Sequence, residues 1–499
     1  MHCLNSVSDR PRTSWLFPNF GGSCRRHVGQ RRATTRSREY GFRLNNRLCA
    51  LLSTLLATPL GLDVLPSQVE VAYGANGAAP AASDPVQHCL DSLQVNLARK
   101  IAPAVPVTSH PVQILSKDLP LQCLAGNLSE IKAALKNQIE NCERKSAAEK
   151  AQTFQFGCRM VKNEDYCLNA NTAMLKIANL PNMDYATFVN RAAREFDWYK
   201  SDTRQTSDGK FATGATRFTG YYSPTAVDAA AERSDAYPYP LYAAPEGLTY
   251  FENPKPDLGQ GCGVEEVTKR PIHWCIDNKD GTFSALPTRE QMAHGALAEK
   301  IRTIVYLRSL YEVSSFMLEG AGSVNLRKKD GSIESVVLNV AGTNGRRNNM
   351  VGDVLKCENK QINGSFAAYY AHHPDEAYRD TVHYNPSTVF YRPGVGYEGV
   401  DHITVTPNAS IATDPTSIPT GTVTLLNVPA PSACRTVSSM AVAQDIGGRI
   451  KGRHVDVYTG AGPAAGAKAN SFNNPGFVFM AVPKAAGAPV PGCGTTSAN

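Results

Sequence analysis

The sequence predicts a mainly β protein with an α-helical N-terminal part. Between about residues 85 and 200, apolar residues recur at the three- and four-residue spacing of amphipathic helices. From "FTGYYSPTAV" (218–227) onward, Gly, Pro, Thr and Val dominate, and short alternating segments are separated by turn residues, which is typical of strands. The 499 residues, 42% of them hydrophobic, are enough for at least two hydrophobic cores.

The first 76 residues resemble an export signal preceded by a basic extension. Arg43 and Arg47 precede the apolar run 48–62, which is too short to span a bilayer comfortably. Small residues suited to cleavage follow in 72–82. We therefore expect an exported protein, with a retained anchor helix as the alternative.

The basic excess of the chain is confined to this N-terminal segment. The net charge of +7 comes from 51 Lys and Arg against 44 Asp and Glu. Ten of the arginines but only four of the acidic residues lie within 1–75, which leaves 41 basic and 40 acidic residues in the remainder. A nearly neutral remainder gives no electrostatic basis for binding nucleic acid, so we expect no nucleic-acid partner.

Cysteine usage agrees with export. Ten of the 13 cysteines remain once the signal is removed, and an even number in an exported chain indicates disulfide bonds. Cys158 with Cys167, and Cys262 with Cys275, are the candidate local pairs. Structural zinc sites commonly use C-x-x-C pairs, which the sequence lacks, so we expect no metal.

Two N-terminal segments predict helices. "NLSEIKAALKNQIENC" (127–142) opens with Asn127 as N-cap and Glu130 three positions later, which is a capping-box pattern. The segment 183–201 places four apolar residues on one side of a helix: Tyr185, Phe188, Ala192 and Tyr199.

Further along, we expect helices over about 288–311 and 366–382, and a flexible Ala/Gly/Pro-rich tail over 485–499. The second helix contains a group of potential metal ligands: His372, His373, Asp375, Glu376 and His383. Pro374 can begin a helix there, with the acids in the first turn, where the helix dipole favours them. This pattern favours a solvated helix start over a metal site.

"FTGYYSP" (218–224) predicts a strand that ends at a proline. Its adjacent residues Tyr221 and Tyr222 would point to opposite faces. At least one ring would then be available to stack on a sugar, although a core position for either ring is equally compatible with the residues.

"AQDIGGRIKGRHVDVYTG" (443–460) predicts a strand, a glycine turn and a second strand. Asp456 alternates with Val455 and Val457, so it lies on a strand opposite an apolar face, which is a poor place for a turn residue. Asp445 precedes the glycine turn, and Asp414 precedes a proline, so turn roles remain open for both. An aspartic-protease dyad would need a second D-[TS]-G loop in an apolar setting, which is absent.

Seven segments occur in the order found in one known family. They are "FTGYYSP" followed by "YPYPLY", "PTREQMAHGALAEK", "FMLEGAGSVNL", "VAGTNGR", "NPSTVFYRPG", "VTPNASIATDPTSIPTGT" and "MAVAQDIGGRIKGRHVDVYTGAG". Over about 155–484 the chain thereby resembles the MltA family of lytic murein transglycosylases, including its C-terminal module named for three aspartates, the 3D module.

The resemblance implies a double-psi β-barrel domain, an inserted smaller β-barrel domain and a groove between them. The expected boundaries follow in chain order: 1–76 extension and signal, 77–222 helical part leading into the first domain, 223–384 inserted barrel, 385–484 double-psi barrel, 485–499 tail.

The resemblance also implies a single catalytic carboxylate. The family's acid corresponds to Asp456, and Asp445 and Asp414 match the other two aspartates of the module, with supporting roles. The expected substrate-binding residues are Thr219, Gly220, Tyr221, Tyr222, Glu319, Gly320, Ala321, Gly322, Gly447, Gly448 and Lys451.

One carboxyl group is enough for the chemistry that the resemblance implies. Asp456 would protonate the bridging oxygen between N-acetylmuramic acid and N-acetylglucosamine, then accept a proton from the muramic acid's 6-hydroxyl, which forms a 1,6-anhydro end. No cofactor or metal takes part. An Asp at its reference pKa of about 3.9 is only ~0.1% protonated at pH 7, so we expect burial or a nearby like charge to raise the pKa of Asp456.

The chain departs from the family at 317–322, where "MLEGAG" replaces Q-x-Q-G-S-G and puts Glu319 at a glutamine position. Two alternatives follow: an expansin-like module that binds glycan without cutting, or a hydrolase that uses Glu319 as a second carboxylate. The partner is expected to be peptidoglycan glycan strands, with association with the outer membrane or a cell-wall complex left open. The location is expected to be the periplasm of a Gram-negative bacterium, and the protein a monomer.

Overall fold

The fold is described from a computed structural model of the chain. The chain divides into two compact units, 1–78 and 79–499, and all the described residues belong to the second. The predicted export signal therefore lies outside the described part. The described residues are 84–101, 111–201, 215–251, 262–265, 272–429, 434–491 and 493.

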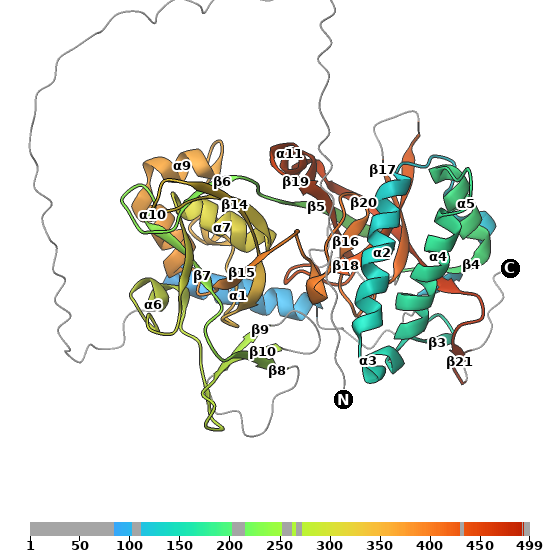
Figure 1. The fold of residues 1–499 in the computed structure, drawn as a ribbon, viewed down its shortest axis with the longest axis horizontal. Coiled ribbons are helices and arrows are strands. Elements are labelled where there is room, and N and C mark those ends of the chain that lie inside the picture. The colour runs from blue at the N-terminus through green and yellow to red at the C-terminus, as the bar shows by residue number, and fades with distance from the viewer. Residues whose placement is uncertain are drawn as a thin grey trace, which may run out of the picture. The chain divides into compact units, whose positions relative to one another are not determined.

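The larger sheet has eight strands in the order β1-β4-β20-β17-β18-β16-β19-β5 (Figure 1). A further pairing of β20 with β5 closes six of these strands into a ring. β16 runs parallel to β18 and β5 parallel to β19, and the other pairs are antiparallel. The strands are β1 (Val112–Ile114), β4 (Phe196–Lys200), β5 (Thr216–Ser223), β16 (Ser410–Ala412), β17 (Val423–Pro429), β18 (Thr436–Asp445), β19 (His454–Ala461) and β20 (Asn473–Pro483).

Alternation along these strands supplies two hydrophobic cores. On β18, Met440 and Val442 pack toward the helices, whereas Ala441 and Ala443 pack with the residues of β19. This is the period of two expected of a strand buried on both faces. Hydrophobic side chains therefore pack against both the inner and the outer face of this ring of strands.

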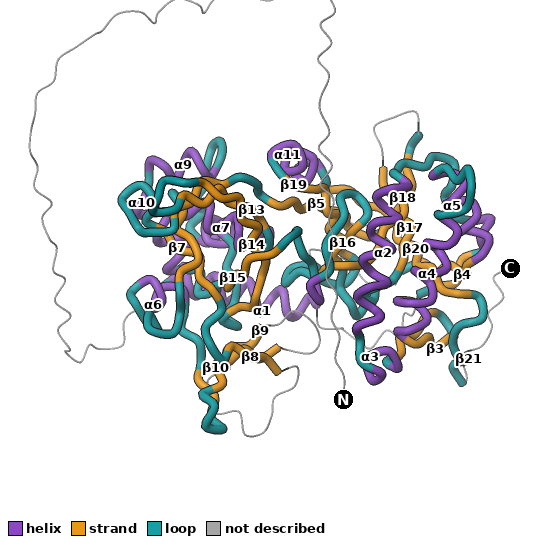
Figure 2. The backbone as a smooth tube through the Cα atoms, in the orientation of Figure 1, coloured by secondary structure: helices purple, strands orange, loops and turns teal. Residues whose placement is uncertain are grey.

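The N-terminal helices cover one face of this sheet (Figure 2). Three further strands form a small separate sheet in the order β2-β3-β21. They are β2 (Thr153–Phe156), β3 (Arg159–Lys162) and β21 (Ala488–Pro489). The covering helices are α2 (Leu128–Arg144), α4 (Ala170–Ala178) and α5 (Tyr185–Glu195), and the short elements η1 (Ser116–Asp118), α3 (Ala147–Ala151) and η2 (Glu164–Asn169) belong to the same N-terminal part. Helix α1 (Pro85–Ile101) lies elsewhere and packs Leu90 against Val354 and Tyr384.

A second group of six strands forms a closed barrel in the order β12-β6-β13-β14-β15-β7. Helix α7 (Leu310–Glu319) packs Val313 and Phe316 into its core. The strands are β6 (Val227–Ala230), β7 (Tyr239–Ala243), β12 (Thr303–Leu307), β13 (Gly322–Arg327), β14 (Ile333–Thr343) and β15 (Val389–Gly394).

The remaining elements connect or flank these barrels. They are β8 (Leu248–Phe251), β9 (Gly263–Glu265), β10 (Ile272–Asp277), β11 (Phe283–Ser284), α6 (Arg289–Ala293), α8 (Val351–Cys357), α9 (Phe366–His372), α10 (Pro374–Tyr378), η3 (Arg379–His383), η4 (Val400–His402) and α11 (Pro463–Ser471).

The predicted fold class, mainly β with a helical N-terminal part and two barrels, is confirmed. The exact domain boundaries stay a prediction. β15 follows the predicted boundary at 384/385, yet it pairs with β14 and β7 in the second barrel.

Three local predictions are corrected. The helix expected over 288–311 is only α6, because Gly295 adopts a positive φ of 89° and the β-branched run that follows forms β12. Helix α5 ends at Glu195, so Tyr199 lies on β4. Asn127 does cap α2, but Glu130 accepts from Asn408 instead of completing the capping box.

The tail prediction is wrong for residues 485–491 and 493. β21 pairs with β3, and Cys493 forms a disulfide with Cys158. A chain end that is paired and covalently bridged is held in place. The helix predicted over 366–382 is present as three short pieces, α9, α10 and η3, with Pro374 beginning α10.

The ten cysteines after the signal form five disulfides, as predicted. The pair Cys262–Cys275 is confirmed, but the pair Cys158–Cys167 is wrong, because each cysteine has a distant partner. The bridges are Cys89–Cys357, Cys123–Cys434, Cys142–Cys167, Cys158–Cys493 and Cys262–Cys275.

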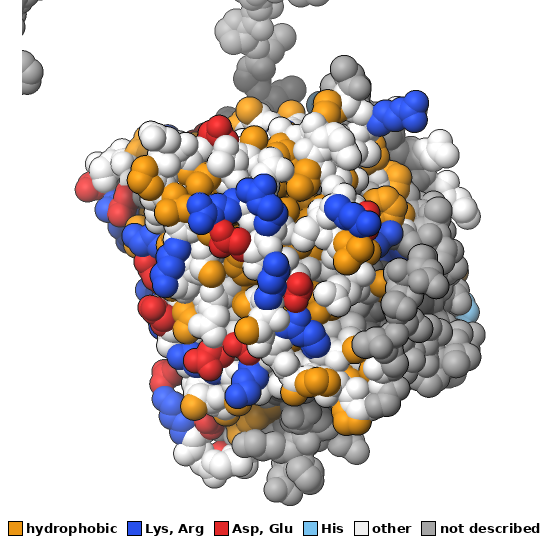
Figure 3. All heavy atoms as spheres, turned by 90° about the vertical axis from the view of Figure 1, so that its right-hand side faces the viewer, with side chains coloured by type: hydrophobic (Ala, Val, Ile, Leu, Met, Phe, Trp, Pro, Cys, Tyr) orange, Lys and Arg blue, Asp and Glu red, His pale blue; other side chains and the backbone are white. Residues whose placement is uncertain are grey.

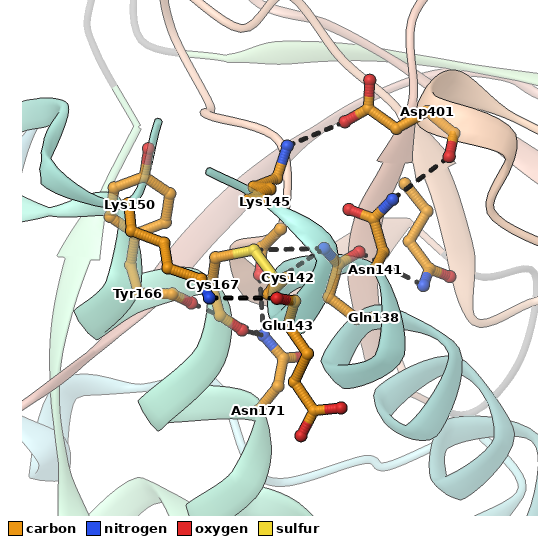
Figure 4. The surroundings of a disulfide bond; sticks show 12 residues. Gln138, Asn141, Cys142, Glu143, Lys145, Lys150, Tyr166, Cys167, Asn171 and Asp401 are labelled. Atoms are coloured by element: carbon orange, nitrogen blue, oxygen red, sulfur yellow. Dashed lines mark hydrogen bonds and ion pairs between the residues drawn. A yellow bond between two sulfur atoms is a disulfide. The ribbon is translucent and has the colours of Figure 1, made fainter. Parts of the chain in front are cut away.

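The bridge between Cys142 and Cys167 fastens the C-terminal end of α2 (Figure 4). From that end, Asn141 donates to the carbonyl of Asp401, and Lys145 forms an ion pair of 2.9 Å with the Asp401 carboxylate. The helical N-terminal part thus supports the loop that contains η4.

The surface in Figure 3 carries Lys and Arg beside Asp and Glu, with hydrophobic side chains between them. This mixture agrees with the near-neutral charge of the chain beyond residue 75. Among the described residues, no helix combines the length and the hydrophobicity that a transmembrane span requires.

Candidate functional site

Asp456 lies near the start of β19, between two strands of the ring. In register, it pairs with Ala412 of β16 and with Thr219 of the parallel strand β5. Its neighbours Val455 and Val457 are buried, whereas Asp456 is partly exposed. The alternation predicted from "HVDVY" therefore places the carboxyl group where both protein and solvent reach it.

The hydroxyl of Thr219 orients this carboxyl group. It donates to Oδ1 of Asp456 over 2.8 Å and lies 2.8 Å from Nε2 of His454. A hydroxyl has one proton, so a hydroxyl that donates to Asp456 must accept from a protonated Nε2 of His454. Thr219 thus links the imidazole to the carboxylate.

Burial raises the pKa of Asp456 to about 7, and the negative charge of Asp445 acts in the same direction. The hydrogen bond from Thr219 and the charge of Arg217 oppose this rise. A carboxyl group with this pKa is about half protonated at neutral pH, so it can both donate and accept a proton there.

Asp445 ends β18, and its carboxyl group accepts hydrogen bonds from Tyr221, Ile446 and Val400. The phenol of Tyr221 donates to Oδ2 over 2.8 Å, and the amide of Ile446 donates to Oδ1 over 2.8 Å. Burial raises its pKa to about 6, against the effect of these bonds and of the Val400 amide. Gly399 is required beside it, because a Cβ there would lie 2.5 Å from the carbonyl oxygen of Gln444 and 3.0 Å from Cγ of Asp445.

Glu319 is the last residue of α7, and the amide of Tyr222 donates to its Oε2 over 3.1 Å. Burial raises the pKa of Glu319 to about 8, and the charge of Asp456 contributes in the same direction. One strand, β5, therefore binds three carboxyl groups: Thr219 binds Asp456, Tyr221 binds Asp445 and Tyr222 binds Glu319.

The carboxyl group of Asp414 is hydrogen-bonded within the fold and stabilises a turn. Its Oδ1 accepts from the amide and the hydroxyl of Thr416, and its Oδ2 accepts from the amide of Gly452 over 2.7 Å. It ties its own turn to the segment that leads into β19, so the turn role left open in the sequence is the one observed.

Two family models match the chain in succession. The MltA specific insert domain matches residues 217–392, and the 3D domain matches residues 409–481. Asp414, Asp445 and Asp456 all lie in the second match, and Glu319 lies in the first. In these two domains the chain matches the MltA family.

Curated relatives carry the family's name. Membrane-bound lytic murein transglycosylase A of Escherichia coli strain K12 is 29% identical over 279 residues, which cover 54% of this chain and 66% of the relative. The protein of the same name from Vibrio cholerae is 27% identical over 278 residues, covering 53% of this chain and 65% of the relative. The chain thus matches slightly less than two thirds of each relative's length.

Solved MltA structures share the fold. A membrane-bound lytic murein transglycosylase from Agrobacterium tumefaciens has a TM-score of 0.56 at 17% identity, covering 75% of this chain and 98% of that one. MltA from Neisseria gonorrhoeae has a TM-score of 0.55 at 18% identity, covering 76% and 94%. E. coli MltA with bound chitohexaose has a TM-score of 0.52 at 22% identity, covering 75% and 94%.

Several residues predicted from the MltA resemblance to bind substrate are packing residues in the structure. A Cβ on Gly220 would lie 2.8 Å from Cα of Ala469, so this glycine lets α11 approach β5. Gly320 ends α7 with a φ of 74°. Gly322 and Ala321 are buried, and a Cβ on Gly322 would meet the ring of Phe316 at 2.6 Å.

The turn between β18 and β19 contains the remaining predicted residues. Gly448 is exposed, and a Cβ there would meet no neighbour. Gly447 packs closely on Ile450, and Lys451 is only 8% exposed. Among these three residues, Gly448 is therefore the one exposed to solvent. Substrate binding by these residues stays a prediction.

Sequence reasoning missed three residues of the site: His454, Arg217 and Gly399. The alternation of "RHVDVY" did put His454 on the same face as Asp456, which was the available signal. Arg217 and Gly399 become neighbours of the carboxyl groups only through strand pairing and loop packing, which local patterns do not reveal.

Two cavities lie away from these carboxyl groups. One of about 470 Å³ is lined by residues that include Tyr242, Met292 and Tyr306, and one of about 500 Å³ by residues that include Lys360 and Arg379. In the described part of the chain, no group of three or more His, Cys, Asp or Glu residues is arranged to hold a metal ion.

Proposed function

We propose that the protein is a peptidoglycan lytic transglycosylase with Asp456 as its single acid and base. It would cleave the β-1,4 bond between N-acetylmuramic acid and N-acetylglucosamine and leave a 1,6-anhydromuramic acid end. The observation that carries this proposal is a partly exposed Asp456 whose pKa is raised to about 7 and whose carboxyl group is oriented by Thr219.

In the first step, protonated Asp456 donates its proton to the bridging oxygen. The bond between that oxygen and C1 of the muramic acid breaks, and positive charge develops at C1. The carboxylate left on Asp456 lies beside this charge and stabilises it. A pKa near 7 keeps enough of the acid protonated at neutral pH for this step.

In the second step, the 6-hydroxyl of the same sugar attacks C1 and its proton passes to Asp456. The acid is thereby regenerated, and no water enters the product. Because the nucleophile belongs to the substrate, a second ionised carboxylate is not needed, in contrast to hydrolytic glycosidases.

The neighbouring groups have supporting roles in this mechanism. Thr219 fixes the carboxyl group, and His454 fixes Thr219. The ionised Asp445, held by Tyr221, keeps the pKa of Asp456 high. Asp414 anchors the turn before β19. The catalytic and substrate-binding assignments of these residues are part of the proposal.

The location and partners proposed follow from the predicted export signal and the relatives. The curated relatives are named membrane-bound, and one solved relative holds chitohexaose. We infer a periplasmic enzyme that acts as a monomer on glycan strands and associates with the outer membrane or with a cell-wall complex.

The test is mass spectrometry of sacculi digested with the purified protein, beside the variant Asp456→Asn. We expect anhydromuropeptides from the wild type and none from the variant, because Asn cannot donate the proton. Glu334→Gln, at an exposed site on β14, is the matched control and should retain activity.

Other products would decide against the proposal. Reducing-end muropeptides from the wild type would mean hydrolysis, with water as the nucleophile. Sacculi that retain the protein without releasing any product would favour a glycan-binding module.

A further inference from the structure

The carboxyl group of Glu319 has no positively charged side chain as a partner among the described residues. Its one hydrogen bond among the described residues is the 3.1 Å contact from the Tyr222 amide to Oε2, and no described Lys or Arg forms an ion pair with it. The side chain is partly buried, so its ionised form loses part of its hydration without gaining a counter-ion. This environment favours the protonated form.

The position of Glu319 in its helix acts in the same direction. It is the last residue of α7, and Gly320, with a φ of 74°, ends the helix there. The C-terminal end of a helix carries partial negative charge, which disfavours a carboxylate. α7 also has no basic residue in its last turn.

The titratable groups that face Glu319 come from two elements. Asp456 acts from β19, and its charge raises the pKa of Glu319, which burial already raises to about 8. Tyr222 faces it from β5, and burial together with the charge of Glu319 raises the pKa of Tyr222. Tyrosines are uncharged at neutral pH, so Asp456 supplies the charge that acts on Glu319.

A protonated carboxyl group has one acceptor oxygen and one donor hydroxyl. Oε2 accepts from Tyr222, and Oε1 has no partner among the described residues, so Oε1 carries the proton and can donate it in a hydrogen bond. Glu319 is near enough to Asp456 for their charges to interact, so that donor belongs to the same site.

We propose that Glu319 is a specificity-determining residue that works in its protonated form, as a hydrogen-bond donor to the glycan beside Asp456. This proposal rests on the proposed function, because it takes the ligand to be a glycan strand. When Glu319 ionises, the donor is lost and glycan binding weakens. A protonated Glu319 also cannot act as a base toward water, so the site remains a transglycosylase at neutral pH despite its second carboxyl group.

Binding, measured without catalysis, tests the proposal. Asp456→Asn removes both the acid and its own titration, and chitohexaose is the probe. We expect its dissociation constant, measured by calorimetry, to rise at least tenfold between pH 7 and pH 9. Only about a tenth of a group with a pKa near 8 remains protonated at pH 9, and loss of the Asp456 charge lowers the pKa of Glu319 further.

Two double variants provide the controls. Asp456→Asn with Glu319→Gln keeps an uncharged donor at every pH, so its dissociation constant should stay within about twofold between pH 7 and pH 9. Asp456→Asn with Glu334→Gln, at an exposed site that pairs with Lys328, should show the same rise as Asp456→Asn alone.

Three outcomes would overturn the inference. One is a dissociation constant that does not change with pH in Asp456→Asn, and another is a tenfold rise that persists in the Gln double variant. The third is release of reducing-end products by the otherwise wild-type enzyme above pH 8 but not by Glu319→Gln, since Glu319 would then be a base toward water. No binding of chitohexaose at any pH would contradict the proposed glycan function as well, which separates the two failures.

Discussion

At the scale of single residues, Asp456 combines a chemical role with a cost in stability. Its pKa of about 7 in the folded protein lies above the value near 3.8 of the unfolded chain. The folded state therefore binds this proton more tightly, so the contribution of Asp456 to stability is highest below pH 4 and is lost as pH rises toward 7. Each unit of difference corresponds to about 1.4 kcal/mol, so the loss is up to about 4 kcal/mol.

Asp456→Asn should therefore stabilise the protein at pH 8 and have little effect at pH 4. Asn keeps an oxygen for the Thr219 hydroxyl but never ionises. Thermal unfolding of both proteins at the two pH values measures the difference. Equal melting temperatures at pH 8 would mean that Asp456 is not penalised in the folded state.

Asp445→Asn should move the upper limb of the pH–rate profile to lower pH. The charge of Asp445 raises the pKa of Asp456, so its removal lowers that pKa and reduces the protonated fraction at a given pH. The profile of kcat/KM for glycan cleavage reports this directly. An unshifted limb would show that another group controls the protonation of Asp456.

Thr219→Val should move the same limb in the opposite direction. The Thr219 hydrogen bond lowers the pKa of Asp456, and its loss lets that pKa rise. The rate should also fall about tenfold or more, because the carboxyl group is no longer oriented. If the variant is slower but the upper limb of its pH–rate profile does not move, Thr219 orients the carboxyl group of Asp456 without setting its pKa.

At the scale of elements, β5 organises the site. Three of its residues bind three carboxyl groups, and its small residue Gly220 lets α11 pack on it closely.

Gly220→Ala should destabilise the protein by about 1–3 kcal/mol, because the new Cβ would meet the backbone of Ala469. Gly448→Ala, in open space, should change stability by less than about 0.5 kcal/mol. Denaturant unfolding compares the two.

Sequence patterns predicted the elements of the site better than its contacts. The period of two in "HVDVY" identified β19 and the exposed side of Asp456, and "FTGYYSP" identified β5. The bond from Thr219 to Asp456 joins residues 237 positions apart, and only the parallel pairing of β5 with β19 brings them together. The helix predicted over 288–311 does not form as one element, because Gly295 and Leu297 both adopt a positive φ.

At the scale of the whole molecule, three disulfides join the two ends of the described chain to distant partners. They connect residues separated by 268, 311 and 335 positions. The number of bridges followed from counting cysteines, but their pairing depends on which surfaces the completed fold brings together. Cys158 faces the C-terminal segment and not the nearby Cys167, because β21 pairs with β3 beside it.

These long-range bridges determine how the molecule would respond to a protease. A single backbone cut between Cys167 and Cys262 would leave two pieces that are still joined by three covalent links. We expect such a nicked protein to migrate as one species on a gel without reductant and as two when dithiothreitol is added. Backbone cleavage and release of fragments are thus separate events for this protein, and the second requires a reducing agent.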